Sequence, residues 1–270
     1  MIRFSNCKIN IGLYITGKRP DGFHNLETVF FPLPLYDVIE FIEDLQTDIS
    51  VIGQHIPGLP ENNIIIKAWN LLKKDFPTLP PVHFYLLKNI PAGAGLGAGS
   101  ANGAHTLLAL NQKFSLGLTE PQLMHYALQL GSDCPFFMLN KPSLAKGRGE
   151  VFTTPRIDLS GYQLVIVNPG IHISTPWAFS QITPAAPVTS LESALTRPVA
   201  EWKQLITNDF ETAVFKAHPE IKEVKDGLYE AGAIFALMSG SGSSVYGLFE
   251  KHTSVNYTVA QHHFVRKMNL

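Results

Sequence analysis

The stretch that most restricts how this 270-residue chain can fold lies at residues 93–99, where four of seven residues are glycine. Glycine loses more backbone entropy on folding than other residues, so such a run is favoured where φ must be positive or a ligand approaches closely. Residues 82–87 have the pattern of a strand, and Ser100 is expected to cap a helix that extends to about residue 111. Strand, glycine loop and helix N-terminus together predict a phosphate site, because unpaired N–H groups and the positive end of the helix dipole converge there.

Two common phosphate loops do not match this segment. The Walker pattern requires a lysine before its Ser or Thr, but here Gly99 is followed directly by Ser100. The dinucleotide pattern G-x-G-x-x-G fails at its last glycine, where Ala98 or Ser100 stands. What remains is a P-x-x-x-G-L-G segment that starts at Pro91 and leads into a helix of small residues. An ordinary glycine-rich turn is the alternative for this motif taken alone.

Composition narrows the class of protein. A hydrophobic content of 45% supplies the core of one large domain or two moderate ones. The net charge of −1 provides no broad electrostatic field, so neither nucleic acid nor a membrane surface is expected as a partner. Without a membrane-length apolar run or a signal peptide, the expected location is the cytoplasm. The two cysteines, Cys7 and Cys134, fit a reducing compartment and do not form a spaced metal set.

The N-terminal segment has the alternation of a strand over residues 3–16. On that pattern Lys8 and Asn10 share an outward face, while Ile9 and Ile11 face the core. A solvated lysine on an edge strand is the alternative interpretation of Lys8, because that is where most lysines lie.

The rest of the chain predicts a mixture of strands and helices. Strands are expected at 28–31, 37–42, 49–52, 162–167, 233–238 and 245–249, and helices at 62–74, 119–131, 198–206, 208–217, 219–231 and 253–263. Asn62 or Asn63 is expected to cap the first of these helices, and Thr119 the second. Asp133 follows that second helix, where it is either a cap for the next turn or a catalytic group. The S-G-S-G-S-S turn that begins at Ser239 is either a second anion nest or a flexible hairpin tip.

Four features follow one another along the chain: Lys8 on an early strand, the loop at 91–101, a Gly-Ser-Asp sequence that ends at Asp133, and the glycine-rich turn at Ser239. In this order the chain resembles the diphosphocytidyl-methylerythritol kinases of the GHMP superfamily, over essentially its full length. The segment Y-I-T-G-K-R-P-D-G-F-H at 14–24 is the part that distinguishes this family from mevalonate, galactose and homoserine kinases.

The resemblance implies an α+β fold of two subdomains, with the active site in the cleft between them. The implied subdomains are residues 1–155, which bind ATP, and residues 156–270. The implied reaction is ATP-dependent phosphorylation of the 2-hydroxyl of 4-diphosphocytidyl-2-C-methyl-D-erythritol, with Mg²⁺, in the non-mevalonate route to isoprenoid precursors. Another small-molecule GHMP kinase, such as a mevalonate or homoserine kinase, and a nucleotide-binding module without catalysis are the alternatives.

Site residues follow from the resemblance position by position. Lys8 and Asp133 are the implied catalytic pair: Asp133 would take the proton of the hydroxyl, and Lys8 would stabilise the negative charge. The implied substrate contacts are Asn10, Phe23, His24 and Phe179. The rings of Phe23 and Phe179 would stack on the cytosine. The implied ATP contacts are Pro91, Ala92, Gly93, Ala94, Gly95, Leu96, Gly97, Ala98, Gly99, Ser100 and Ala101. The chain departs from the family pattern with Ala101 in place of a serine and Phe23 in place of a tyrosine, and no protein ligand of the metal is assigned.

Overall fold

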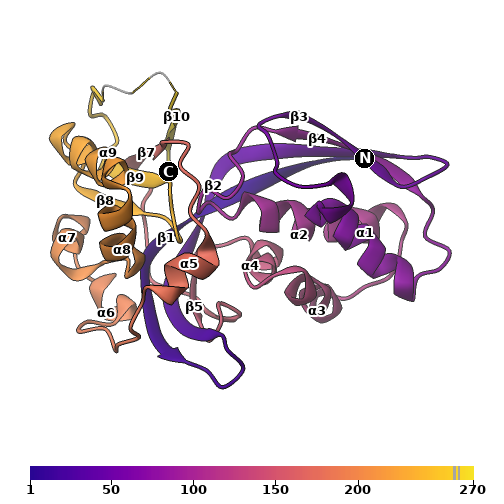
Figure 1. Ribbon diagram of the computed structural model, residues 1–270, viewed down its shortest axis with the longest axis horizontal. Helices are drawn as coiled ribbons and strands as arrows, with labels where there is room; N and C mark the ends of the chain where they lie inside the picture. The colour runs from indigo at the N-terminus through magenta and orange to yellow at the C-terminus, as the bar shows by residue number, and fades with distance from the viewer. Residues whose placement is uncertain (258–259, 261) are drawn as a thin grey trace. The chain divides into compact units, whose positions relative to one another are not determined.

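The computed structural model describes residues 1–257, 260 and 262–270 (Figure 1). Its contacts group the chain into two compact units whose segments alternate along the sequence. Unit 1 comprises Met1–Lys8, Pro34–Ala92 and Gly97–Lys141, and unit 2 comprises Ile9–Leu33, Gly93–Leu96 and Pro142–Leu270. The long strands β1 (Ile2–Lys18) and β2 (His24–Glu43) therefore each contribute to both units. A single subdomain boundary at 155/156 stays a prediction.

Unit 1 is a sheet with helices on one face (Figure 1). Its strands are the first part of β1, the second half of β2, β3 (Asp48–Gly53) and β4 (Val82–Lys88). β4 pairs antiparallel with β2, with Leu87 opposite Val38, and parallel with β3, with His83 opposite Asp48. Its helical segments are η1 (Pro60–Asn62), α1 (Ile64–Asp75), α2 (Ala98–Lys113), α3 (Glu120–Leu130) and α4 (Cys134–Leu139). A covered face explains why every second side chain of β4 from Val82 to Leu86 is buried.

Two helix starts in unit 1 confirm their predicted caps. Asn63 is the N-cap of α1, and its side chain accepts a 3.0 Å hydrogen bond from the Ile65 N–H. Thr119 and Gln122 form the capping box that starts α3. The buried stripe of α1 consists of Ile65, Ile66, Ala68, Trp69 and Leu72. Sequence pattern and tertiary packing agree for both helices.

Unit 2 contains a four-stranded antiparallel sheet in the order β10-β7-β9-β8. Its strands are β7 (Tyr162–Asn168), β8 (Phe235–Met238), β9 (Val245–Glu250) and β10 (Phe264–Asn269). In the same unit β5 (Ser143–Lys146) pairs with the first half of β2, and β6 (Val151–Thr153) pairs with β5. Its helices are α5 (Thr175–Ser180), α6 (Leu191–Ala194), η2 (Val199–Glu201), α7 (Trp202–Leu205), α8 (Phe210–Ala217) and α9 (Pro219–Glu230). α9 packs against β8 and β9 (Figure 1).

The break predicted between two of the strands is absent. The strands expected at 28–31 and 37–42 are one continuous strand, β2. Its prolines, Pro32 and Pro34, lie between the stretch paired with β5 and the stretch paired with β4, so neither ladder needs their missing N–H.

The helix expected at 253–263 is absent from the described part of that segment, and residues 258, 259 and 261 lie outside the described residues. Thr253 and Val255 are β-branched, which weakens helix propensity. In addition, the buried Gln163 side chain donates a 2.6 Å hydrogen bond to the Thr253 carbonyl, which fixes the chain as a turn there.

The predicted outward face of β1 is also wrong. Ile9 and Ile11 are buried as expected, but Lys8 and Asn10 are buried too, with 3% and 1% of their surface exposed. A buried lysine must be paired or hydrogen-bonded to offset its lost hydration. The solvated edge-strand interpretation of Lys8 is therefore wrong as well.

Candidate active site

The glycine loop after β4 has the backbone that the sequence predicts. Gly93, Gly95 and Gly97 have φ angles of 64°, 77° and 66°, all in the left-handed region that favours glycine. A Cβ on Gly95 would lie 2.0 Å from the carbonyl oxygen of Ser239, so close approach is a second reason for glycine there. Both observations show a glycine segment held in one backbone conformation, and its role as a phosphate loop rather than an ordinary glycine-rich turn stays a prediction.

The helix after the loop begins earlier than the sequence suggests. Gly97, not Ser100, is the N-cap of α2, and its positive φ sets the entry of the chain into the helix. Ser100 instead lies within the first turn, where its hydroxyl hydrogen-bonds the Cys134 thiol. The first N–H groups of any α-helix have no carbonyl partner within it, and the first turn of α2 contains no acidic residue. This end of α2 is therefore suited to an anion.

Lys8 passes directly beside that helix start. A Cβ on Gly97 would lie 2.9 Å from Lys8 Cε and 3.1 Å from Lys8 Cγ, so glycine is needed here to make room for the lysine stem. A Cβ on Gly99, by contrast, would meet no described heavy atom within 4 Å. Unit 1 thus places a lysine against one side of the α2 N-terminus and open space beside Gly99.

The same lysine pairs with Asp133. Lys8 Nζ lies 3.6 Å from Asp133 Oδ2, with the Lys8 side chain 3% exposed and that of Asp133 36% exposed. Burial lowers the pKa of Lys8, and the Asp133 charge and hydrogen bond oppose that shift. Asp133 is also the N-cap residue of α4 but, over the described chain, makes no side-chain cap hydrogen bond. The structure therefore does not support the cap interpretation of Asp133, and its catalytic role stays a prediction.

Both cysteines of the chain flank this pair in sequence, and both are buried free thiols. Burial raises the pKa of Cys7 to about 12 and that of Cys134 to about 12. Thiols with such pKa values are protonated at neutral pH and are poor nucleophiles. The geometry supports packing as their role.

The second glycine-rich turn, Ser239–Ser244, packs against the part of the glycine loop that belongs to unit 2. The Ser239 hydroxyl donates a 2.8 Å hydrogen bond to the Gly95 carbonyl, and the Ser244 N–H donates to the Ala94 carbonyl at 3.1 Å. Both serines are fully buried. Asn208 holds the turn from outside by donating 2.8 Å bonds to the carbonyls of Met238 and Gly240. The turn is therefore not a flexible hairpin tip but a support for the loop.

Asn10 belongs to this buried network. Its backbone N–H donates to Ser239 Oγ at 3.1 Å, and its side-chain amide donates to Thr28 Oγ1 at 2.9 Å. Tyr246 donates a 3.0 Å hydrogen bond to the Asn10 carbonyl. Asn10 thus links β1 to the turn that supports the phosphate loop, and its predicted contact with the substrate stays a prediction.

The predicted aromatic contacts fall into two pairs in unit 2. Phe23 is 48% exposed, and the Arg148 guanidinium lies over its ring at 3.7 Å from the centroid. His24 stacks on Phe179, with centroids 5.1 Å apart and ring planes 22° apart. Arg148 was not singled out as a site residue from the sequence, although its K-G-R-G turn is a recognisable basic signal. A base bound here would meet a cation as well as aromatic rings.

A resident metal centre is not evident. Within residues 1–257, 260 and 262–270, no group of three or more His, Cys, Asp or Glu side chains is placed to hold a metal ion. Mg²⁺ in kinases is bound mainly by nucleotide phosphates, water and one or two carboxylates, so a dedicated cluster is not required.

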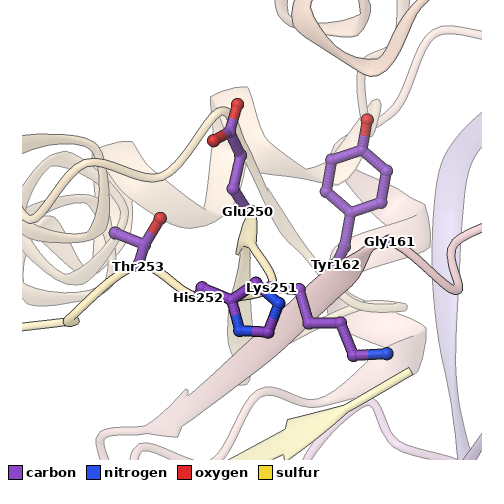
Figure 2. A pocket seen from close by; sticks show the side chains of 6 residues that line it. All are labelled: Gly161, Tyr162, Glu250, Lys251, His252 and Thr253. Carbon is purple, nitrogen blue, oxygen red and sulfur yellow. The ribbon is translucent and has the colours of Figure 1, made fainter.

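One hollow of about 650 Å³ lies elsewhere in unit 2 (Figure 2). It is lined by Gly161, Tyr162, Glu250, Lys251, His252 and Thr253. These residues include none of the predicted site positions, so the hollow does not coincide with the glycine loop.

None of the helices in the described part of the chain has both the length and the hydropathy that a membrane span requires.

Comparison with known proteins defines the class. The family models described as GHMP kinases N terminal domain and GHMP kinases C terminal match residues 63–141 and 190–257. The crystal structure of a Methanococcus jannaschii mevalonate kinase superposes with a TM-score of 0.63 at 14% identity, over 93% of this chain and 91% of that one. The two family models and the fold define the chain as a GHMP kinase.

More specific relatives identify the family. A 4-diphosphocytidyl-2-C-methyl-D-erythritol kinase of Bacteroides fragilis is 51% identical over 267 residues, which cover 96% of this chain and 97% of that protein. A crystal structure of 4-(cytidine 5'-diphospho)-2C-methyl-D-erythritol kinase is 31% identical with a TM-score of 0.74, over 92% of this chain and 90% of that one. The chain belongs to the 4-diphosphocytidyl-2-C-methyl-D-erythritol kinase family.

Proposed function

We propose that this protein transfers the γ-phosphoryl group of ATP to the 2-hydroxyl of 4-diphosphocytidyl-2-C-methyl-D-erythritol, giving the 2-phosphate and ADP. The observation that carries the proposal is the full-length identity of 51% to a kinase of that name. The buried Lys8 paired with a partly exposed Asp133, beside a loop with phosphate-binding backbone, supplies the chemistry. The reaction belongs to the non-mevalonate route to isoprenoid precursors.

Asp133 acts as the general base of this reaction. Its exposed carboxylate accepts the proton of the 2-hydroxyl as the oxygen attacks the γ-phosphorus, and the bond from that phosphorus to the bridging oxygen of ADP breaks. Lys8 contributes a positive charge beside the reacting oxygen. Because Lys8 is almost fully desolvated, its charge is screened little and acts strongly on the developing negative charge.

The phosphates of ATP lie on the loop 91–101. The backbone N–H groups at the start of α2 donate to phosphate oxygens, and the glycines allow the phosphates to come close to the main chain. Mg²⁺, when bound with ATP, would neutralise part of the phosphate charge, and no protein ligand is assigned to it. The support of Ser239 and Ser244 keeps the loop in the required backbone conformation.

The cytosine of the substrate is recognised by Phe23 and by the His24–Phe179 pair. Stacking on Phe23 provides affinity for any base, whereas hydrogen bonds from His24 to the base edge select cytosine. Arg148, which already lies over the Phe23 ring, adds positive charge close to that ring. Asn10 contributes through its place beside the supporting turn.

A direct assay separates this function from its alternatives. Purified protein is incubated with Mg-ATP and, in turn, with the cytidine-linked alcohol, mevalonate and homoserine, while ADP release is followed. Phosphorylation of the first alcohol alone is expected, and its product carries phosphate on the 2-oxygen by ³¹P NMR. Preference for mevalonate or homoserine would reassign the substrate, and ATP binding without turnover on any alcohol would leave a non-catalytic module. The cytoplasm as location, and the lack of nucleic-acid and membrane partners, stay predictions.

A further inference from the structure

A buried ion pair lies behind the phosphate loop in unit 1. Lys88, the last residue of β4, places its Nζ 2.5 Å from Oδ2 of Asp37 on β2. Both side chains are closed to solvent, with exposures of 2% and 0%. Neither residue is among those implicated in the reaction. Replacing such a buried pair by apolar residues is often neutral or stabilising, so the stability of the fold is a weak reason for its presence.

The Asp37 carboxylate accepts three further hydrogen bonds. Its Oδ1 accepts from the backbone N–H groups of Asn89 and Ile90, both at 2.9 Å. Its Oδ2 accepts from Nδ2 of Asn102 at 3.1 Å. One carboxylate therefore satisfies four donors from two segments of unit 1, residues 88–90 and α2.

These donors bracket the phosphate loop. Asn89 and Ile90 immediately precede Pro91, and Asn102 immediately follows Ala101. Asp37 thus binds the chain just before the loop begins and again in α2 just after it ends. Fixing both ends of a glycine-rich segment removes much of the conformational freedom that its glycines would otherwise retain.

The orientation of the Asn102 side chain shows that the hydrogen bonds to Asp37 leave one buried polar atom without a partner. Its Nδ2 must face the carboxylate, because the reverse orientation would place two acceptors against each other. As a result Asn102 Oδ1 is buried with no hydrogen-bond partner among the described residues. A buried acceptor without a hydrogen-bond partner destabilises the fold. A site selected for stability alone would avoid it.

We propose that Asp37 is a positioning residue for ATP: with Lys88 and Asn102 it clamps the two ends of the 91–101 loop, so that the loop's N–H groups are preorganised for the phosphates. The inference rests on the proposed function, in which that loop binds ATP. Asp37 is fully buried, so it is not expected to contact ATP or the alcohol directly. Its effect is therefore on nucleotide affinity and on motion of the loop.

The first test is Asn102→Ala, which releases one end of the loop. It removes one hydrogen bond and one orphaned acceptor together, so little stability is lost. We expect the Kd for ADP, measured by calorimetry, to rise about threefold or more and amide exchange over residues 91–101 to accelerate. Tyr126→Phe, which removes the hydrogen bond to Asp75 in the same unit, is the matched control and leaves both readouts unchanged. Unchanged Kd and exchange in Asn102→Ala would overturn the clamp.

The second test separates the acceptor from the charge. The double variants Asp37→Asn/Lys88→Met and Asp37→Leu/Lys88→Met both lack the buried charges, but only the first keeps an oxygen for the two backbone N–H groups. Its new amide also allows Asn102 to flip and use its orphaned oxygen. We expect the leucine variant to bind ADP about tenfold or more weakly than wild type and the asparagine variant to restore most of that loss. Equal affinity in the two variants would refute positioning by Asp37.

Failure of the proposed function is distinguishable from failure of this inference. ADP binding and amide exchange do not require the alcohol, so they report on the clamp even if the wild type phosphorylates a different acceptor. If the wild type phosphorylates the cytidine-linked alcohol while Asn102→Ala binds ADP normally, only the clamp is refuted. If the wild type does not bind ADP at all, the loop is not an ATP site and the clamp for ATP falls with it.

Discussion

The ammonium group of Lys8 lies 3.6 Å from the carboxylate of Asp133, and the two side chains differ sharply in exposure. Lys8 is closed to solvent, whereas Asp133 is accessible to a ligand. This asymmetry suits a pair in which the lysine provides a fixed, poorly screened charge and the aspartate exchanges a proton with substrate.

Lys8 gives the reaction a predictable dependence on alkaline pH. Burial lowers the Lys8 pKa below its usual 10.5, so the ammonium loses its proton at a lower pH than an exposed lysine does. Activity that needs the charge is therefore present below the lowered pKa and is lost as pH rises through it. We expect the alkaline limb of kcat/KM to fall below pH 10.5 and to move upward in Lys8→Arg, which stays charged. An alkaline limb at the same pH in both proteins would contradict this role.

Replacing Gly97 or Gly99 by alanine should have opposite effects on the stability of the protein. Gly97→Ala forces a side chain into a φ of 66° and against Lys8 Cε, so we expect a loss of about 1–2 kcal/mol in stability, together with a lower kcat. Gly99→Ala meets open space in a helical position and should retain or slightly raise the Tm. If phosphate occupies that space, Gly99→Ala weakens ADP binding all the same. Thermal unfolding and ADP calorimetry on both variants check the prediction. Normal ADP binding by Gly99→Ala would show that no phosphate occupies the space beside Gly99.

The two cysteines should not react with thiol reagents in the native protein. With both thiols buried and their pKa values raised to about 12, a thiol reagent at pH 8 should modify Cys7 and Cys134 only after denaturation. Cys134→Ala should retain substantial activity, because the thiol packs and hydrogen-bonds Ser100 without taking part in the reaction. Mass spectrometry of labelled protein, with and without denaturant, checks the first statement. Loss of turnover in a well-folded Cys134→Ala protein would overturn the second.

The local parts of the fold follow from sequence because local chemistry determines them. Asn63 and Thr119 are recognisable caps, since short polar side chains satisfy helix N–H groups regardless of distant packing. The positive φ angles of Gly93, Gly95 and Gly97 were likewise expected from composition. By contrast, the pattern predicts a helix at 253–263, whereas residues 253–257 are not helical and the distant Gln163 side chain binds the Thr253 carbonyl.

The non-local parts of the candidate site could not be predicted. Alternation along β1 separates Lys8 from Ile9 but does not indicate that both faces are covered, so Lys8 was expected outside. The hydrogen bond from Ser239 to Gly95 joins residues that are 144 positions apart, and no pattern in either segment encodes it. The same applies to Arg148 over Phe23, which depends on how a distant turn packs.

Specificity for cytosine is tested by substitutions at Phe23 and His24. Phe23→Tyr should be nearly neutral, because the ring is retained, whereas Phe23→Ala should cost about 1–3 kcal/mol of substrate binding. His24→Ala should reduce the preference for cytosine over uracil, since a wrong base no longer leaves a protein group unpaired. The measurement is kcat/KM for the cytidine and uridine forms of the substrate. Equal values in the wild type would exclude recognition of the base edge altogether.

The most direct test of the account is the turnover of Asp133→Asn. The substitution keeps the size of the side chain but removes the base, so kcat should fall by about 10²-fold or more while the Kd for ADP stays near that of the wild type. Asp226→Asn is the matched control, because Asp226 is an exposed carboxylate that is also paired with a lysine, Lys222, and it should turn over normally. Wild-type kcat in a folded Asp133→Asn protein would contradict the assignment of Asp133 as the base that accepts the 2-hydroxyl proton.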